Sequence, residues 1–185
     1  LLPGSRSAAV GRIFPLLLAG FRKARESKPA LKATVVYPSA KIRDLLESVI
    51  ATQPDLAQQI EFVSNKTDNL PGSAVLMSSG TMSLGCALSG IPGAIAYRLN
   101  PMSYWLGRLL VKVKYIGIAN LLLDRPLHPE FIQSAASPAQ LSRQLLRALD
   151  QTEAVVEAQD GAVELRELLH AGNDASATDW LARGL

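Results

Sequence analysis

Short apolar runs alternate along this chain with longer segments in which apolar residues recur at helical spacing. Runs of strand length lie at residues 34–37, 60–63, 74–77, 94–97 and 115–118. Helical spacing covers residues 8–27, 39–52, 81–89 and 102–112. Near-continuous apolar strands separated by helices are typical of a parallel sheet that is covered on both faces. The pattern therefore predicts an α/β fold with a Rossmann-like parallel sheet and helices on both of its faces.

The first helical segment follows an abrupt start and contains a proline. Leu1-Leu2 is interpreted as the end of a strand that begins earlier, so we expect the chain to be part of a longer polypeptide. Pro15 lies well inside this segment, and an interior proline costs a helix about 3 kcal/mol through its missing N–H and its ring clash. This predicts either a kink near Arg12 or a helix that begins later than residue 8.

Beyond residue 125 the pattern becomes helical throughout. The Ser-Pro pair at 137–138 forms a helix start, with serine as N-cap and proline in the first turn, and this helix runs to about residue 150. A second helix is predicted at residues 153–170, ended by the Gly-Asn-Asp sequence at 172–174 and followed by a short last helix. We therefore expect a sheet domain at residues 1–150 and a helical tail at residues 151–185 that packs across a domain or subunit boundary.

Composition favours a folded domain over a disordered segment. Apolar residues make up 48% of the 185 residues and charged residues 19%, which provides enough apolar surface for a core. Cys86 is the only cysteine, which excludes an internal disulfide and a cysteine-based zinc site, and no metal or cofactor is predicted. The sequence contains no run of about 18 consecutive apolar residues without a charge, so it predicts no membrane-spanning helix. The net charge of +3 is mildly basic, and its location matters more than its sum.

Two turns after predicted strands carry residues that suit a phosphate group. Ligands of open α/β sheets bind at the carboxyl ends of the strands. In the first turn, Gly4 allows close backbone approach, Arg6 offers a forked guanidinium group, and the following helix start offers free N–H groups. The second turn, Ser-Ser-Gly-Thr at 78–81, again places glycine and hydroxyl groups before a helix.

Spacing alone leaves a simpler alternative open at both turns. An ordinary strand-to-helix turn with a surface arginine explains the first at least as well. A plain N-cap made by Ser79 or Thr81 explains the second. Neither turn matches the P-loop pattern, and the chain has no G-x-G-x-x-G sequence, so a dinucleotide site or a Walker-type site is disfavoured.

A third feature is a basic segment with aromatic residues at 98–125, in which Asp124 is the only acid. Its predicted helix carries the aromatic and basic residues Tyr104, Trp105, Arg108 and Lys112. Basic residues mixed with tryptophan and tyrosine suit a membrane interface. The alternative is a half-buried helix whose basic ends are solvated.

The last polar candidates follow the apolar run at 115–118. Asn120 comes directly after this run. Glu130 and Gln133 are three residues apart on a short predicted helix, which places them on one face. Together they suit the polar edge of a ligand, and decoration of a helix start is the alternative.

Histidine and cysteine chemistry is not indicated. His128 and His170 have no partners at metal-ligand spacing and are interpreted as surface residues. Cys86 lies in an apolar helical segment and is assigned to the core. The chain shows no Ser/His/Asp triad pattern and no H-E-x-x-H sequence.

Together and in this order, the four features resemble the C-terminal half of the lipid-A-disaccharide synthase family. The resemblance is carried by LLPGSR, by the long block from SSGTMSLG to YIGIANLL, and by HPEFIQ, and it covers roughly residues 1–150. The family consists of glycosyltransferases with two Rossmann-like domains, the GT-B type. The resemblance therefore implies one half of a GT-B fold.

The resemblance also implies a function. The family joins UDP-2,3-diacylglucosamine to 2,3-diacylglucosamine 1-phosphate and releases UDP at the inner face of the bacterial inner membrane. Its C-terminal half binds the donor's UDP, so the chain is expected to be that half of a glycosyltransferase of lipid A biosynthesis. The expected location is cytoplasmic and peripheral at the inner membrane. A homodimer through the C-terminal helices is also expected, and a nucleic-acid partner is not.

The family's motifs carry over residue by residue. Its Gly-Ser-Arg turn near the UDP phosphates, its Ser-Gly-Thr turn, its Asn-Leu-Leu segment and its Pro-Glu-x-x-Gln segment all have matches in this chain. The implied nucleotide-binding residues are Gly4, Ser5, Arg6, Ser79, Gly80, Thr81, Asn120, Glu130 and Gln133. The implied membrane-facing residues are Tyr104, Trp105, Arg108 and Lys112.

One departure from the family bears on affinity. Four residues beyond the threonine of the Ser-Gly-Thr turn, where the family has a glutamate, this chain has Gly85. In related transferases such an acid binds the ribose hydroxyl groups, so weaker nucleotide binding is expected here. The general base and the acceptor groove are expected in the other half of the enzyme, so this chain alone is expected to bind UDP without turnover. The alternative is a catalytically degenerate homologue that acts as a membrane- or partner-binding module.

Overall fold

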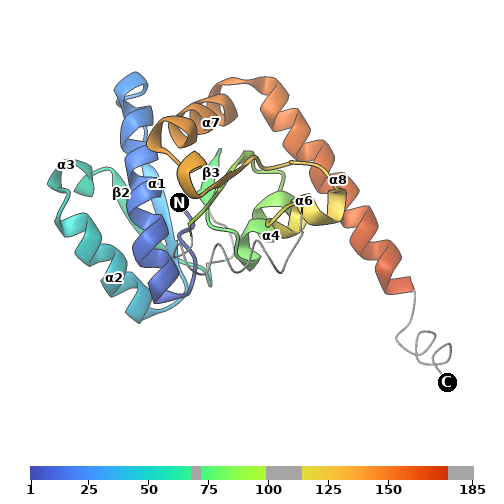
Figure 1. Ribbon diagram of the computed structural model, residues 1–185, viewed down its shortest axis with the longest axis horizontal. Helices are drawn as coiled ribbons and strands as arrows, with labels where there is room; N and C mark the ends of the chain where they lie inside the picture. The colour runs from blue at the N-terminus through green and yellow to red at the C-terminus, as the bar shows by residue number, and fades with distance from the viewer. Residues whose placement is uncertain (68–71, 99–113, 175–185) are drawn as a thin grey trace.

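The computed structural model of the chain describes residues 1–67, 72–98 and 114–174 (Figure 1). In chain order its elements are α1 (Ser7–Ser27), β1 (Ala33–Tyr37), α2 (Ala40–Ala51), α3 (Pro54–Ala57), β2 (Ile60–Ser64), β3 (Val75–Met77), α4 (Thr81–Leu88), β4 (Gly93–Tyr97), α6 (Ile118–Leu123), β5 (Glu130–Ile132), η1 (Gln133–Ala135), α7 (Pro138–Asp150) and α8 (Thr152–Asp174). Apart from the consecutive pairs α2–α3 and β2–β3, strands and helices alternate up to β5 in the described residues.

Residues 1–2 take a central place among the parallel strands. β1 pairs with β2, and β3, β4 and β5 pair in that order. Leu1 and Leu2 join the two groups, because the N–H of Val36 donates to Leu1 O at 3.1 Å and the N–H of Leu2 donates to Leu76 O at 2.9 Å. The spatial order is therefore β2, β1, residues 1–2, β3, β4, β5, which is the Rossmann order. The predicted fold class is confirmed, and Leu2 forms an isolated parallel bridge with Met77 between the two groups of strands.

Alternate side chains of the strands face two separate apolar clusters. On one face, Val35 and Leu76 are buried in a cluster shared with α1, α2 and α7. On the other face, Val36 and Met77 belong to a second cluster, against which the half-buried Cys86 of α4 packs. Helices therefore cover both faces of the sheet, and the assignment of Cys86 to the core is confirmed.

α1 is helical throughout although it contains Pro15. The proline is exposed to solvent, whereas Phe14, Leu17 and Phe21 are buried on the opposite side. A helix that begins later than residue 8 is therefore wrong, since α1 begins at Ser7. The same helix packs mainly on α7, and Gly20 makes this possible because a Cβ there would lie 2.7 Å from Leu141 Cβ.

Two predicted elements are wrong in the region after β4. Residues 115–118 do not form a strand, because the segment bends and Gly117 is the N-cap of α6. The edge position of the sheet belongs instead to β5, where the sequence predicts a short helix. Ile116 packs on the second apolar cluster without pairing as a strand. A short apolar run indicates burial, and burial alone does not distinguish a strand from a buried loop.

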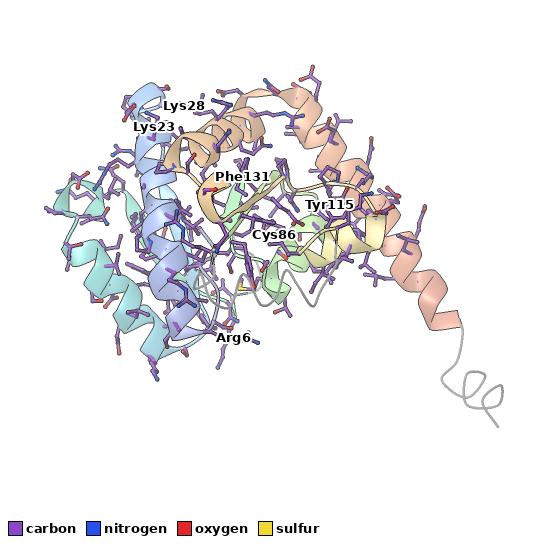
Figure 2. All side chains as sticks on the ribbon, in the orientation of Figure 1. Arg6, Lys23, Lys28, Cys86, Tyr115 and Phe131 are labelled. Carbon is purple, nitrogen blue, oxygen red and sulfur yellow. The ribbon has the colours of Figure 1, made fainter. Side chains whose placement is uncertain are left out.

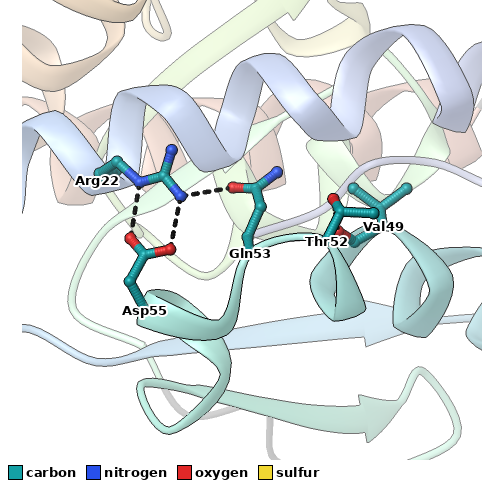
Figure 3. A network of polar contacts seen from close by, with 5 residues as sticks. All are labelled: Arg22, Val49, Thr52, Gln53 and Asp55. Carbon is teal, nitrogen blue, oxygen red and sulfur yellow. Dashed lines mark hydrogen bonds and ion pairs between the residues drawn. The ribbon is translucent and has the colours of Figure 1, made fainter.

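A short helix, α3, was not predicted from the sequence. It begins with Pro54 and buries Leu56. Figure 3 shows how α1 holds it: Arg22 Nη2 lies 2.9 Å from Asp55 Oδ1 and donates to Gln53 Oε1 at 3.0 Å. The helix predicted at residues 102–112 lies outside the described residues.

The C-terminal helices follow the prediction with one exception. α7 begins with Pro138 in its first turn, and Ser137 Oγ accepts a hydrogen bond from the N–H of Gln140. α8 runs through the predicted break at 172–174, because one glycine costs a helix only about 1 kcal/mol. α8 packs on α4 and α6, with Leu165 in one apolar cluster with Ala87 and Ala119, and its Ala158 and Ala162 are buried as well. Packing across a domain or subunit boundary stays a prediction.

Candidate functional site

The two predicted phosphate turns meet in the structure. Gly4 has a φ of +103°, and a Cβ at this position would lie 2.9 Å from Ser78 Oγ. The N–H of Ser78 also donates to Leu2 O at 2.8 Å. The turns therefore lie side by side where the strand order reverses, which is the place where Rossmann-like sheets bind ligands.

A cleft of about 460 Å³ opens between the turns. The predicted nucleotide-binding residues that line it are Ser5, Arg6, Ser79, Gly80 and Thr81. Gly4 is not among the lining residues and instead fixes the turn behind them. The lining also includes residues that the motifs did not assign to this site, among them Arg12, Tyr97, Arg98 and Ile118. Arg98 directly follows β4, so the strand-end rule applied to residues 94–97 would have found it.

The two helices that begin at the cleft have no side-chain cap. Arg6 is the N-cap of α1 and Gly80 is the N-cap of α4, and neither makes a side-chain hydrogen bond to its helix. By contrast, Ser39 caps α2 and Ser137 caps α7 through their hydroxyl oxygens. A plain N-cap made by Ser79 or Thr81 is therefore wrong. The first N–H groups of α1 and α4 can donate to an anion in the cleft.

The described lining of the cleft is cationic. It contains Arg6, Arg12 and Arg98 and no aspartate or glutamate. Arg98 Nη2 donates to Ala136 O at 3.4 Å, which holds its guanidinium group at the carboxyl edge of the sheet. Figure 2 shows Arg6 at the start of α1, at the opposite end of the helix from Lys23. Charge, hydroxyl groups and free N–H groups in this cleft together suit a phosphate ester.

Asn120 and Glu130 lie in a buried hydrogen-bond network outside this lining. Glu130 accepts hydrogen bonds from the N–H groups of Ile116 at 2.8 Å and Gly117 at 2.9 Å, and from Asn120 Nδ2 at 2.8 Å. Asn120 is fully buried, and its amide also donates to His128 O at 2.7 Å and accepts from His128 N at 3.0 Å. The network joins α6 to β5 and thereby places Ile118 at the cleft.

The helix face predicted for Glu130 and Gln133 is wrong. Glu130 lies in strand β5, so it does not share one face of a helix with Gln133. Gln133 follows the carboxyl end of β5 with a left-handed φ of 54° and is half-buried. Asn120, Glu130 and Gln133 are not among the described lining residues of the cleft.

His128 is buried, which makes its prediction as a surface residue wrong, whereas His170 is exposed as predicted. His128 Nε2 lies 2.8 Å from Ile91 O, and His128 Nδ1 has no hydrogen-bond partner among the residues that the structure describes. Burial lowers the pKa of this imidazole below its ordinary value of 6.5, although the bond to Ile91 opposes the shift. The ring is therefore neutral at pH 7. Burial likewise raises the pKa of the Cys86 thiol, which disfavours a reactive thiolate.

Three further predictions concern the position of Gly85, the membrane-facing residues and the absence of a metal site. A Cβ at the exposed Gly85 would meet nothing within 4 Å, so a longer side chain fits there. The predicted membrane-facing residues Tyr104, Trp105, Arg108 and Lys112 lie outside the described residues. Within the described ranges, no group of three or more His, Cys, Asp or Glu residues is placed to hold a metal ion.

The strand order and the cleft define a Rossmann-like domain with a cationic ligand cleft at its switch point. The chain belongs to the lipid-A-disaccharide synthetase family, whose family model matches residues 1–182. Relatives include the lipid-A-disaccharide synthases of Salmonella agona (strain SL483), Salmonella newport (strain SL254) and Salmonella heidelberg (strain SL476). Each is 32% identical over 180 residues, which cover 97% of this chain and 47% of the relative. The family resemblance is confirmed, and the chain spans about half the length of these curated relatives.

Proposed function

We propose that this chain is the donor-binding half of a lipid-A-disaccharide synthase and that its cleft holds the UDP part of UDP-2,3-diacylglucosamine. The observation that carries the proposal is the meeting of two uncapped helix starts and three guanidinium groups in one cleft. Helix-start N–H groups donate to phosphate oxygens, and the guanidinium fork matches their geometry. Membership in the lipid-A-disaccharide synthetase family supports the proposal, and the identity of the nucleotide and of the sugar is part of what is proposed.

The proposed chemistry is transfer of the diacylglucosamine group with UDP as leaving group. Negative charge grows on the diphosphate as its bond to the anomeric carbon breaks, and Arg6 and the N–H groups at the start of α4 are placed to stabilise it. The acceptor, 2,3-diacylglucosamine 1-phosphate, and a general base are assigned to the rest of the full-length enzyme. The described lining supports this assignment because it contains neither carboxylate nor histidine. This chain alone is therefore proposed to bind UDP without turnover.

The residues outside the lining take different parts in the proposal. Asn120 and Glu130 act through α6, since their polar groups are hydrogen-bonded within the chain. Gln133 directly follows the carboxyl end of β5, at the edge of the sheet where ligands of such folds bind, and is proposed to contact the nucleotide from there. No cofactor is proposed.

Calorimetric titration with UDP tests the nucleotide assignment. Arg6→Ala is expected to weaken UDP binding by about tenfold or more, because hydrogen bonds to charged groups contribute about 1.5–3 kcal/mol. Arg43→Ala is the matched control, since it removes the same side chain from the exposed surface of α2, where it pairs with Glu47. An absence of heat at millimolar UDP, with Arg6→Ala equally silent, overturns the assignment.

A second candidate function follows from Gly85. A Cβ at Gly85 would meet nothing within 4 Å, so the structure has room for the glutamate that the family has at this position. The glycine therefore removes a ligand contact without a packing reason. The second candidate is a degenerate homologue that binds a membrane or a partner without using UDP. Titration with UDP, run beside flotation with liposomes that contain or lack anionic lipid, separates the two candidates. A chain that floats and ignores UDP supports the second.

Peripheral attachment to the inner membrane is part of both candidates. Leu121 and Leu122 of α6 are 49% and 43% exposed and lie near the end of the basic aromatic segment at 98–125. None of the helices in the described ranges is long and apolar enough to cross a membrane. The exposed Val163 and Leu168 of α8 offer a surface for the proposed homodimer, which sedimentation at increasing concentration tests.

A further inference from the structure

The cleft gathers more positive charge than one phosphate group requires. Arg6 comes from the N-cap of α1, Arg12 from the same helix further along, and Arg98 from the end of β4. No ion pair to any of these three is present in the part of the chain that the structure describes. Like charges that share a cleft repel each other unless an anion lies between them. An extended anion with more than one charged group fits this arrangement.

Arg12 is directed toward the cleft by helix geometry. Side chains on a helix lean toward its N-terminus, so Arg12 leans toward the end of α1 that borders the cleft, which it lines. Arg6 and Arg12 are six residues apart, about 9 Å along the helix axis, so they occupy different stretches of the cleft. Arg98 approaches from another element and is anchored by its bond to Ala136 O. A single phosphate at the first turn of α1 would leave Arg12 unused.

We propose that Arg12, together with Arg98, forms a subsite for the second phosphate, so that the cleft selects diphosphates over monophosphates. The inference rests on the proposed function and deepens it by naming the residues that distinguish UDP from UMP. Neither residue is among those that the family's motifs assign to the nucleotide. Arg12 and Arg98 are specificity-determining residues in this account, since each of them lines the cleft directly.

Titration of the full chain with four ligands tests the subsite. The ligands are pyrophosphate, phosphate, UDP and UMP. The wild-type chain is expected to prefer pyrophosphate over phosphate and UDP over UMP. Arg12→Gln is expected to lose about tenfold in affinity for pyrophosphate and UDP while UMP changes by less than about twofold, because the substitution removes one charge-assisted contact. Arg12→Lys is expected to recover part of the loss, since it keeps the charge and loses the fork.

Lys23→Gln is the matched control for charge. It removes one positive charge from the same helix at the end far from Arg6, as Figure 2 shows, and it is expected to leave all four affinities unchanged. The side chains of Arg12 and Lys23 are both exposed, so neither substitution disturbs the core.

The outcomes separate the subsite from the nucleotide assignment. Tight UDP binding that Arg12→Gln leaves unchanged, or an equal loss for UDP and UMP, overturns the subsite and leaves the proposed function standing. Pyrophosphate binding that depends on Arg12, with no gain from the uridine group, supports the subsite and overturns the nucleotide assignment. An absence of binding for both UDP and pyrophosphate overturns both.

Discussion

Asn120 Nδ2 donates to Glu130 Oε1 at 2.8 Å, and this bond joins helix α6 to the edge strand β5. Both residues belong to motifs that the family resemblance assigns to the nucleotide. In the structure their polar groups hold backbone groups of the chain, with His128 and Gly117 among the partners. The pair therefore supports the wall of the cleft from behind.

Asn120→Ala is expected to destabilise the fold by about 2–4 kcal/mol, because it leaves the buried N–H and carbonyl of His128 without partners. Urea unfolding measures the change. Asn65→Ala, at an exposed turn after β2, is the control and should shift the midpoint little. A midpoint for Asn120→Ala that equals the wild-type value contradicts the structural role.

Gly4→Ala is expected to cost about 1–3 kcal/mol in the free energy of unfolding, because the φ of +103° is strained for alanine and its Cβ would lie 2.9 Å from Ser78 Oγ. Gly11→Ala is the matched control. It lies in α1 with nothing within 4 Å of its Cβ, so it should stabilise the fold by about 0.5–1 kcal/mol. Thermal unfolding of both variants checks the pair. Equal effects would contradict the contact between the turns.

His128 is expected to make stability depend on pH. Its pKa in the folded state is below 6.5, so below pH 6.5 the unfolded chain binds a proton that the folded chain does not. The free energy of unfolding therefore stays high above pH 6.5 and falls as the pH decreases from there toward the lowered pKa, by up to about 1.4 kcal/mol per pH unit. Urea unfolding at several pH values measures the slope.

The histidine variants assign this slope to one residue. His128→Gln should flatten the pH dependence, and His170→Gln, at an exposed position, should leave it unchanged. A slope that survives His128→Gln would assign the effect to other groups.

Gly85→Glu is expected to increase UDP affinity by about tenfold, because an acid at this position binds ribose hydroxyl groups in related transferases and the structure leaves room for it. The gain should be smaller for 2′-deoxy-UDP, which lacks one of the hydroxyl groups. Gly85→Gln controls for size without charge. Calorimetry that finds the same gain for UDP and for 2′-deoxy-UDP would rule out the ribose contact.

The sequence predicted the parts of the fold that depend on local patterns. β1, β2, β3 and β4 lie within a residue or so of the apolar runs, because buried parallel strands are apolar on both faces. The two turns were found because glycine and hydroxyl residues follow strand ends. α7 was found from its Ser-Pro start.

The misses have a common physical origin in long-range contacts. β5 is short and begins with the charged Glu130, so its sequence is not an apolar run typical of a buried strand. The Glu130 carboxylate is nevertheless bound, since it accepts a hydrogen bond from the N–H of Ile116 just before α6. His128 was placed at the surface because its partner, Ile91, lies 37 residues away. Arg12 belongs to the cleft only because α1 begins beside the second turn. Local periodicity contains none of these relationships.

The central claim is that the starts of α1 and α4 bind the diphosphate of UDP. The most direct measurement is the change in backbone amide NMR shifts on addition of UDP. The account predicts the largest changes at Ser7, Ala8, Thr81 and Met82, the first residues of the two helices that begin uncapped beside both turns, and small changes at the capped start of α2. Changes that are spread over the surface, or that are centred away from both helix starts, would contradict it.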